Sequence, residues 1–284
     1  QNQIMGRICT TSLMIAIACV LQLLVWNVNA GHHHHTGVQH PATNSKPVSA
    51  SNPYGQPRLH HHNEIQPEID RKLIPEDLLG SHEYVRIAPS NSGAQDNQND
   101  PDLVQYQIGT EFSGQYVNGH VFKLSNPRNH FSIHTPPAGC TSKSTVATTA
   151  KEHDCLLATN AGFFIPHGTD ASGNICLGNL VEDTVIKRNT GVANANFGLT
   201  TSGEFVTGYL SQQNVTDLSF DSLVQGVIWL VKDGAVNVNE SLHLEYMATQ
   251  RSGSGRQFVD LNASRTAVGH DALGNLIIAQ IDGE

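Results

Sequence analysis

The chain has 284 residues, a formal net charge of −9 at pH 7 and 38% hydrophobic residues. Its 16 Lys and Arg are outnumbered by 25 Asp and Glu and form no basic stripe, which argues against binding to nucleic acid. From about residue 103 onward the chain is long enough to bury a sizeable core.

The N-terminal residues have the features of a secretory signal peptide. Arg7 follows Met5, residues 13–26 are mostly apolar, and Val28-Asn29-Ala30 is a small-residue cleavage motif. The apolar run is shorter than the ~20 residues that a membrane-spanning helix needs. We therefore expect residues 1–30 to be a cleaved signal with a few upstream residues, which sends the protein into the secretory pathway.

Residues 31–102 form a low-complexity segment rich in His, Asn, Gln, Ser and Pro. Such a composition cannot bury enough apolar surface to offset its chain entropy, so we expect a disordered leader or pro-segment. The histidine runs at 32–35 and 60–62 lack the Cys or carboxylate pattern of a defined metal site. Arg71-Lys72 is a weak signal for dibasic processing within this segment.

From about residue 103 the pattern changes to short apolar segments that predict β-strands. Strands are expected at 104–108, 117–124 and 156–159, and residues 144–154, which lack Gly and Pro, predict a helix with a Ser or Thr cap. Turn signals predict three hairpins, which pair 196–200 with 205–210, 227–231 with 235–238, and 266–269 with 276–281. The expected fold is α+β, with mostly antiparallel strands and hairpins and a few helices in one domain at 103–284.

Three cysteines remain after removal of the signal, namely Cys140, Cys155 and Cys176. Thiols pair in an oxidising compartment, so an odd count requires a further partner or leaves one free buried thiol. Glycosylation sequons begin at Asn214, Asn239 and Asn262. Asn262 is the least favourable acceptor because a glycan there would crowd Arg265.

Several short motifs occur in an order that resembles the phosphodiester glycosidase family. They are Asn160-Ala161-Gly162-Phe163-Phe164, Cys176-Leu177-Gly178-Asn179, Asn194-Ala195-Asn196-Phe197-Gly198, Val206-Thr207-Gly208-Tyr209-Leu210, Gly226-Val227-Ile228-Trp229-Leu230, the segment 264–271 and Asp282-Gly283. Each motif alone is unspecific, whereas the ordered set is specific. The resemblance implies an enzyme that hydrolyses N-acetylglucosamine-1-phosphodiesters and so exposes mannose-6-phosphate on lysosomal enzymes.

Hydrolysis of a sugar-1-phosphodiester needs a cation for the phosphate, a carboxylate for the anomeric carbon and amides for the acetamide group. The resemblance implies Arg265, Asp282 and Asn160 as the catalytic residues. From the residues alone, a structural ion pair explains Arg265 equally well, and an ordinary turn explains Asp282 better. The implied substrate-binding residues are Gly162, Phe163, Asn179, Thr266, His270 and Asp271. Structural alternatives are a disulfide-tethered turn at Asn179 and a hairpin bend at His270-Asp271.

The resemblance also implies a Cys140–Cys176 disulfide, with Cys155 bonded to a cysteine beyond Glu284. Family members continue with a helix and an Asn-Leu-Asp-Gly-Gly-Gly-Ser loop, so we expect the domain to be incomplete at its C-terminus and residues 1–284 to be inactive alone.

The resemblance implies that the partners are phosphorylated N-glycans of lysosomal enzymes. It also implies that the enzyme works in the Golgi lumen or after secretion and forms a homo-oligomer. No membrane anchor is visible, and no cofactor or metal is expected. The alternatives are a secreted glycan-binding protein of the same fold and a hydrolase of another sugar-phosphate diester.

Overall fold

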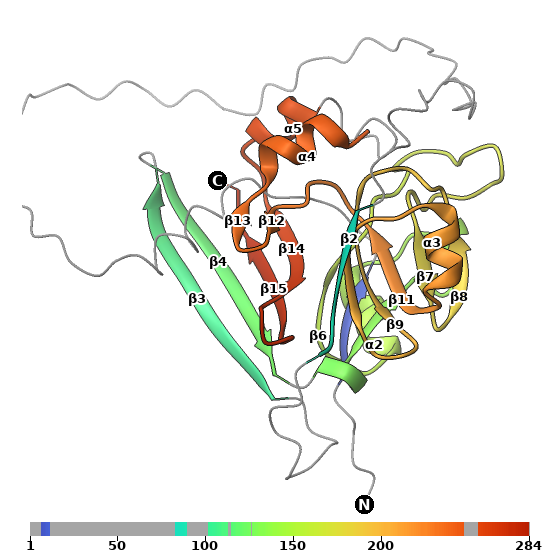
Figure 1. Cartoon of the computed structure of the whole chain (residues 1–284), viewed down its shortest axis with the longest axis horizontal. Helices are drawn as coiled ribbons and strands as arrows, with labels where there is room; N and C mark the ends of the chain where they lie inside the picture. Colours follow the sequence, from blue (N-terminus) through green and yellow to red (C-terminus); the bar gives the residue numbers. More distant parts are fainter. Residues whose placement is uncertain are drawn as a thin grey trace, which may run out of the picture.

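The computed structural model describes residues 7–11, 83–89, 102–112, 115–125, 127–246 and 255–283. Its strands are β1 (Arg7–Thr11), β2 (Tyr84–Ile87), β3 (Leu103–Phe112), β4 (Gln115–Leu124), β5 (Phe131–His134), β6 (Cys155–Asn160), β7 (Leu180–Glu182), β8 (Val185–Arg188), β9 (Ala195–Thr200), β10 (Phe205–Tyr209), β11 (Phe220–Gln225), β12 (Val231–Lys232), β13 (Ala235–Val236), β14 (Arg265–His270) and β15 (Leu276–Ile281). Its helices are η3 (Pro127–Asn129), η4 (Gly139–Thr141), α2 (Val146–Glu152), α3 (Gln212–Asp217), α4 (Val238–Leu244) and α5 (Gly255–Asp260). The expected α+β fold, mostly antiparallel with a few helices, is confirmed (Figure 1).

A six-stranded antiparallel sheet forms one half of the domain, in the order β2-β10-β9-β11-β7-β8. At its centre is the predicted hairpin of β9 and β10, in which Leu199 pairs with Phe205 and the Thr200 N–H bonds the Glu204 carbonyl. β2 pairs with β10, so the sheet includes four residues that precede the expected domain start at Leu103.

A four-stranded antiparallel sheet, in the order β14-β15-β4-β3, forms the other half. The predicted hairpin of β14 and β15 pairs Arg265 with Ile281 and His270 with Leu276. Because of this register, the beginning of β14 and the end of β15 lie at the same end of the sheet. α4 and α5 lie above that end, on the same side as the C-terminus (Figure 1).

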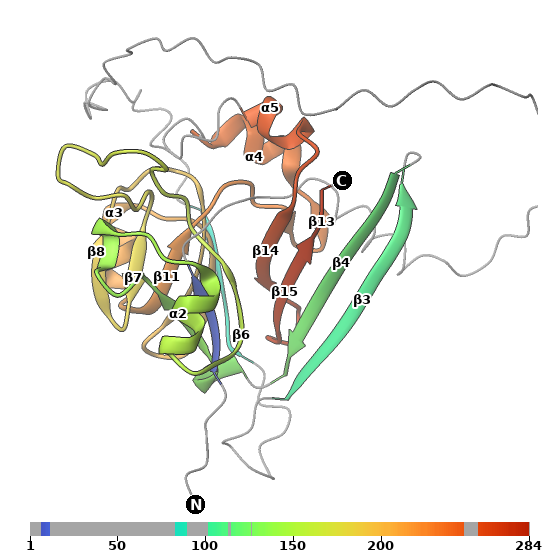
Figure 2. The ribbon, with the colours of Figure 1, turned by 180° about the vertical axis from the view of Figure 1, so that it is seen from behind.

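The main core joins the two large sheets. Leu124 of β4, Phe131 of β5, Phe205 of β10 and Leu276 of β15 are buried in one apolar cluster. Phe131 meets the ring of Phe205 edge-on at 6.2 Å between centroids. Burial of each such side chain contributes about 1.5–3 kcal/mol, so this cluster holds the sheets together along the interface that Figure 2 shows from behind.

A parallel three-stranded sheet, in the order β5-β1-β6, was not predicted from the sequence. Thr11 of β1 pairs with His134 of β5 on one side and with Asn160 of β6 on the other. α2 packs against β1 and β6 and begins at Thr145, whose hydroxyl accepts the Thr148 N–H, as its predicted cap should. β1 lies within the segment expected to be a cleaved signal.

One predicted hairpin strand is absent. Asp233-Gly234 does form a turn, but the paired strands are only β12 and β13, and residues 227–230 form a loop. Ile228 has φ +65°, a left-handed conformation that is incompatible with a strand. Trp229 is nevertheless buried, as a core residue of this segment should be.

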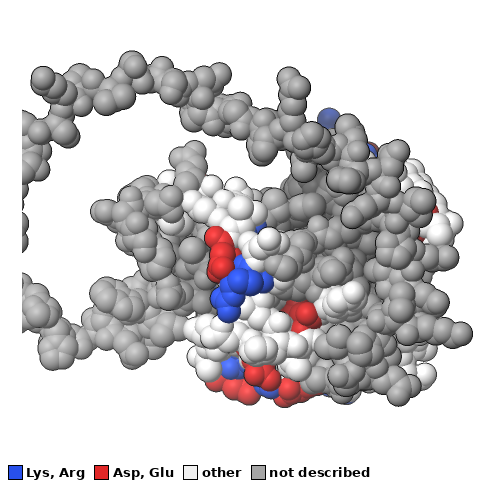
Figure 3. All heavy atoms as spheres, turned by 90° about the horizontal axis from the view of Figure 1, so that it is seen from above, with Lys and Arg blue, Asp and Glu red and all other residues white. Residues whose placement is uncertain are grey.

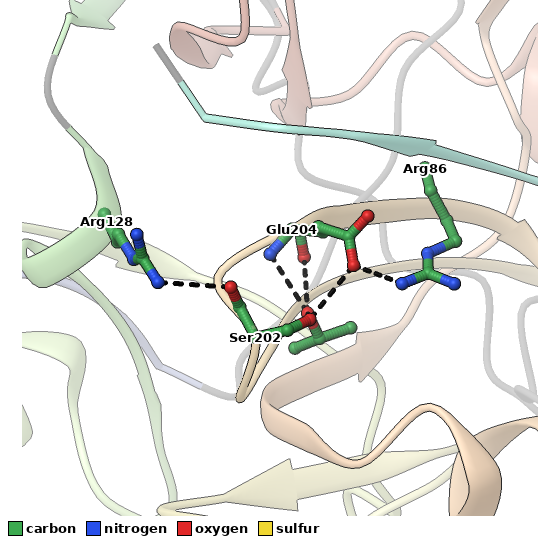
Figure 4. A network of polar contacts seen from close by, with 5 residues as sticks. Arg86, Arg128, Ser202 and Glu204 are labelled. Atoms are coloured by element: carbon green, nitrogen blue, oxygen red, sulfur yellow. Dashed lines mark hydrogen bonds and ion pairs between the residues drawn. The ribbon is translucent and has the colours of Figure 1, made fainter. Parts of the chain in front are cut away.

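Two arginines hold the turn between β9 and β10 (Figure 4). Arg128 of η3 donates to the Ser202 carbonyl at 3.2 Å, and Arg86 of β2 is ion-paired with Glu204. Gly203 adopts φ +83°, and the Arg128 guanidinium lies where a side chain at Gly203 would be. Exposed ion pairs contribute only about 0–1 kcal/mol, so these contacts mainly fix the position of the turn.

The face in Figure 3 shows acidic and basic groups interspersed among mainly uncharged described residues. None of the helices in the described ranges combines the length and the apolar character needed to span a bilayer.

Candidate functional site

The end of β6 and the beginning of β14 meet through a hydrogen-bonded group of polar side chains. Asn160 is the last residue of β6, and its Oδ1 accepts hydrogen bonds from the Thr266 hydroxyl at 2.6 Å and the Thr159 hydroxyl at 3.1 Å. The structure thus brings together two residues that the sequence predicted for the site. We call Asn160, Thr159 and Thr266 the β6–β14 cluster.

Asp282 lies at the same end of the four-stranded sheet. Its Oδ1 accepts the Asn118 N–H at 2.7 Å, and its own N–H donates to the Asn118 carbonyl at 3.0 Å. Gly283 follows, and a Cβ at that position would lie 1.9 Å from the Ala263 carbonyl carbon. The Asp-Gly pair therefore packs directly against the segment that leads into β14, where only glycine fits.

Arg265 is 4% exposed and lies beneath α5. Its Nη2 donates to the Phe258 carbonyl at 3.0 Å and to the Leu261 carbonyl at 2.6 Å, and its guanidinium lies 4.8 Å from the centre of the Phe258 ring. A cation is favourable at the end of a helix, where carbonyls lack partners. Since neighbouring residues of a strand point to opposite faces, Arg265 faces α5 while Thr266 faces β6.

Phe163 and Gly162 lie under this end of the sheet. Phe163 is 4% exposed and packs with Phe258, Val227 and Ile228, and Gly162 is also buried. The predicted role of Phe163 as a sugar-facing ring therefore has no support from its position. Its place in the core supports the arrangement of α5 and the loop at residues 227–230.

His270 and Asp271 lie at the opposite end of β14 from Arg265. A strand rises about 3.3 Å per residue, so roughly 13–16 Å separates them from Thr266 in the β6–β14 cluster. The Asp271 carboxylate accepts from the Leu273 and Asn275 N–H groups and lies 3.1 Å from the Lys123 ammonium. These bonds outweigh the effect of burial and lower the pKa of Asp271. The structure thus shows the hairpin bend rather than part of a shared site.

Asn179 lies in the core at 0% exposure, where a substrate has no access. Its Oδ1 accepts from the Thr190 N–H at 2.8 Å and the Thr190 hydroxyl at 3.1 Å, while its Nδ2 donates to Asn196 Oδ1 at 3.1 Å. Asn196 and Gln225 continue the network to backbone carbonyls. This geometry favours the structural alternative for Asn179, because buried amides need such partners.

The phosphodiester glycosidase family profile matches residues 153–284, which include β6, β14, β15 and Asp282. N-acetylglucosamine-1-phosphodiester alpha-N-acetylglucosaminidase of Mus musculus is 38% identical over 203 residues, 69% of this chain and 37% of the relative. The Homo sapiens protein of the same name is 38% identical over 182 residues, 62% of this chain and 34% of the relative. The chain belongs to the phosphodiester glycosidase family.

A solved structure agrees with this assignment. The catalytic domain of the zebrafish enzyme of the same name, described as auto-inhibited by its pro-peptide, is 34% identical with a TM-score of 0.59. The match covers 71% of this chain and 66% of that one. The chain spans only 37% and 34% of the length of the mouse and human relatives.

The disulfide that the family resemblance implied is confirmed. Cys140 and Cys176 are bonded, with their Cα atoms 5.2 Å apart. Cys155 is also disulfide-bonded within this chain, whereas the sequence interpretation placed its partner beyond Glu284. The parallel sheet, which had not been anticipated, places Cys155 opposite Arg7 and so brings the N-terminal segment to β6.

Of the three sequons in this family member, two have exposed acceptors. Asn239 on α4 and Asn262 before β14 are exposed. Asn214 is half-buried, and its Oδ1 accepts from Ser211 in the capping box of α3. Within the described ranges, no cluster of three or more His, Cys, Asp or Glu side chains is arranged to hold a metal ion.

Two clusters of buried polar side chains were not predicted from the sequence. In the first, His134 lies between Ser132 and Glu182, with Ser132 Oγ 2.9 Å from His134 Nε2 and His134 Nδ1 3.5 Å from the Glu182 carboxylate. Burial raises the pKa of Glu182, but contacts with His134 and Thr135 outweigh it and lower the pKa to about 2. Because Ser132 is buried within β5, this array joins β5 to β7 rather than facing a substrate.

His153, the C-cap residue of α2, stacks on His134 with 3.7 Å between ring centroids. Burial, followed by the neighbouring His134, lowers the pKa of His153. The second cluster surrounds Glu245, in a segment that carries none of the family motifs.

Proposed function

We propose that this chain forms part of an enzyme that hydrolyses N-acetylglucosamine-1-phosphodiesters and exposes mannose-6-phosphate on lysosomal enzymes. The observation that carries this proposal is 38% identity over 203 residues to a mouse protein named N-acetylglucosamine-1-phosphodiester alpha-N-acetylglucosaminidase. Supporting it, the β6–β14 cluster and Asp282 lie at one end of the sheet. The acceptors would be phosphorylated N-glycans, and the enzyme would act as a homo-oligomer.

The reaction breaks the bond between the anomeric carbon and a phosphate oxygen, with positive charge developing on the sugar. In our proposal Asp282 supplies the carboxylate that stabilises this charge, and Asn160 and Thr266 hold the acetamide or hydroxyl groups. The contacts of Arg265 with α5 favour a supporting role, in which it fixes α5 at this end of the sheet.

The test is release of N-acetylglucosamine from a GlcNAc-α-1-phospho-6-mannose diester by the protein secreted from its full reading frame. We expect release, with mannose-6-phosphate left behind. Thr266→Val, which removes the hydroxyl and keeps the shape, should lower kcat/KM by about tenfold or more, whereas Thr201→Val at an exposed turn should not. No release by well-folded, disulfide-bonded protein would overturn the proposal.

We also propose that the protein enters the secretory pathway and works in the Golgi lumen or after secretion. The support is the signal-like sequence at 1–30, the sequons and the Cys140–Cys176 disulfide. Cleavage after Ala30 would remove β1 from between β5 and β6. N-terminal sequencing of secreted protein should begin at Gly31, and recovery of residues 7–11 in the mature chain would contradict cleavage and make β1 a permanent strand.

We propose further that the leader before Arg71-Lys72 restrains activity. The zebrafish relative is described as auto-inhibited by its pro-peptide, and Arg71-Lys72 precedes β2, so cleavage there leaves β2 in its sheet. Proteolysis at this pair should raise kcat/KM of the secreted protein, and Arg71→Gln should block that increase. Equal activity before and after cleavage would exclude inhibition by this segment.

A further inference from the structure

Glu245 is a buried carboxylate that the proposed reaction does not use. It caps the end of α4, and its Oε2 accepts the Ile228 N–H at 2.7 Å. Its Oε1 accepts the Trp229 N–H at 3.0 Å and the Tyr209 hydroxyl at 3.4 Å. Ser241, one turn earlier on α4, also bonds to the Trp229 N–H and the Tyr209 hydroxyl. One carboxylate thus binds two consecutive backbone N–H groups of the 227–230 loop.

The backbone held by Glu245 is strained. Ile228 adopts φ +65°, a region that β-branched residues rarely occupy and that costs about 1–3 kcal/mol. Such a conformation persists only where surrounding contacts determine it, and here those contacts are the two bonds from Glu245. Strain of this kind clusters at sites where a precise position matters.

The strained turn packs against buried side chains that adjoin the candidate site. Val227 and Ile228 share a buried cluster with Phe163 and Phe258. Phe163 is three residues after Asn160, and its ring lies 6.1 Å from that of Phe258. Phe258 in turn binds Arg265 through its carbonyl and its ring. A displacement of the turn is therefore transmitted to both strands of the β6–β14 cluster.

We propose that Glu245 is a positioning residue, which holds the Ile228–Trp229 turn and, through Phe163 and Phe258, sets the geometry of the β6–β14 cluster. This inference rests on the proposed function for its catalytic consequence, whereas the anchoring of the turn stands independently of it.

The groups that face the carboxylate come from four elements. They are Tyr209 of β10, Ser241 of α4, the Ala195 backbone of β9 and the N–H groups of the loop, with Lys232 over the Trp229 ring. Burial outweighs these bonds and raises the pKa of Glu245 to about 7. Burial, and then Glu245 itself, raises the pKa of Tyr209 beyond its ordinary value. The anchor therefore changes charge near neutral pH, and the turn should report that change.

Trp229 offers a direct probe of the anchor, because Trp26 is the only other tryptophan in the sequence. In a Trp26→Phe background, Trp229 fluorescence should change with a midpoint near pH 7 when titrated across about pH 5 to 9. Glu245→Gln should abolish this transition. Glu240→Gln, which removes an exposed carboxylate one turn earlier on α4, should preserve it. The same transition in Glu245→Gln would overturn the anchoring role.

A milder variant, Tyr209→Phe, tests the same network in case Glu245→Gln misfolds. Tyr209→Phe removes only a hydroxyl that donates to the carboxylate, so it should move the fluorescence midpoint to higher pH. An unchanged midpoint in a folded Tyr209→Phe protein would also contradict the proposed network.

Enzyme kinetics test whether Glu245 sets the geometry of the candidate site. In the full secreted enzyme, Glu245→Gln should lower kcat by about tenfold or more with little change in KM, and remove a limb near pH 7 from the kcat profile. Glu240→Gln should match the parent enzyme. Unchanged kcat and pH profile in Glu245→Gln would overturn positioning. If the parent enzyme itself releases no sugar, the proposed function fails while the fluorescence result still decides the anchor.

Discussion

Asn179 separates a substrate-binding interpretation from a structural one. Asn179→Ala removes the acceptor of the half-buried Thr190 N–H and hydroxyl and the donor to the buried Asn196. Each of these three groups, left without a partner, costs about 1–3 kcal/mol, so the loss should total about 3–9 kcal/mol. That is a large part of the ~5–15 kcal/mol by which a domain is stable. At about 2–4 °C per kcal/mol, Tm should fall by roughly 6–36 °C.

Thermal unfolding of the secreted protein, followed by circular dichroism, measures this loss. Asn129→Ala, at an exposed position in η3, is the matched control and should change stability by less than about 0.5 kcal/mol. A variant Asn179→Ala that keeps its Tm but raises KM for the phosphodiester substrate would refute the structural argument and restore Asn179 to the site.

Three further predictions concern other buried contacts. Arg265→Ala removes the bonds to the Phe258 carbonyl in α5 and the Leu261 carbonyl just after it, and should lower stability by about 2–4 kcal/mol, seen as reduced secretion; normal folding with lost turnover would instead assign Arg265 to phosphate binding. Because the folded-state pKa of Glu182 is about 2, below its ordinary 4.5, its stabilisation is present above pH 4.5 and is lost as pH falls toward 2. Urea unfolding should show a weaker acid dependence in Glu182→Gln, and an identical dependence would exclude this role. Joint replacement of Cys140 and Cys176 by Ser removes a disulfide of sequence separation 36 and should lower the free energy of unfolding by about 4 kcal/mol. The urea midpoints of the parent and the variant measure this loss, and unchanged midpoints would show that the bond contributes no stability.

Local signals in the sequence predicted much of the fold because turns and caps depend on neighbouring residues. Ser202-Gly203, Asp233-Gly234 and the 271–275 turn all form where the sequence placed them. The strand expected at 227–231 was wrong, since an apolar run also fits a buried loop. The loop is held by the Glu245 carboxylate, which follows Ile228 by 17 residues and accepts its N–H.

Part of the candidate site was also accessible from sequence. Asn160 and Thr266 were both expected there, and the structure joins them by a hydrogen bond. His270 and Asp271 are close to Thr266 in sequence but lie at the other end of β14, because an extended strand separates its ends. The burial of Phe163 likewise depends on α5, which lies far along the chain.

By itself the sequence determined the class of fold, the β9–β10 and β14–β15 hairpins, the Cys140–Cys176 pairing through its family resemblance, and membership of the phosphodiester glycosidase family. Only the tertiary structure decided which polar side chains face one another. It enclosed Asn179, placed Arg265 under α5 and brought Glu245 to the Ile228–Trp229 turn. The physical reason is that burial and long-range hydrogen bonds arise when distant segments pack, and no local pattern records them.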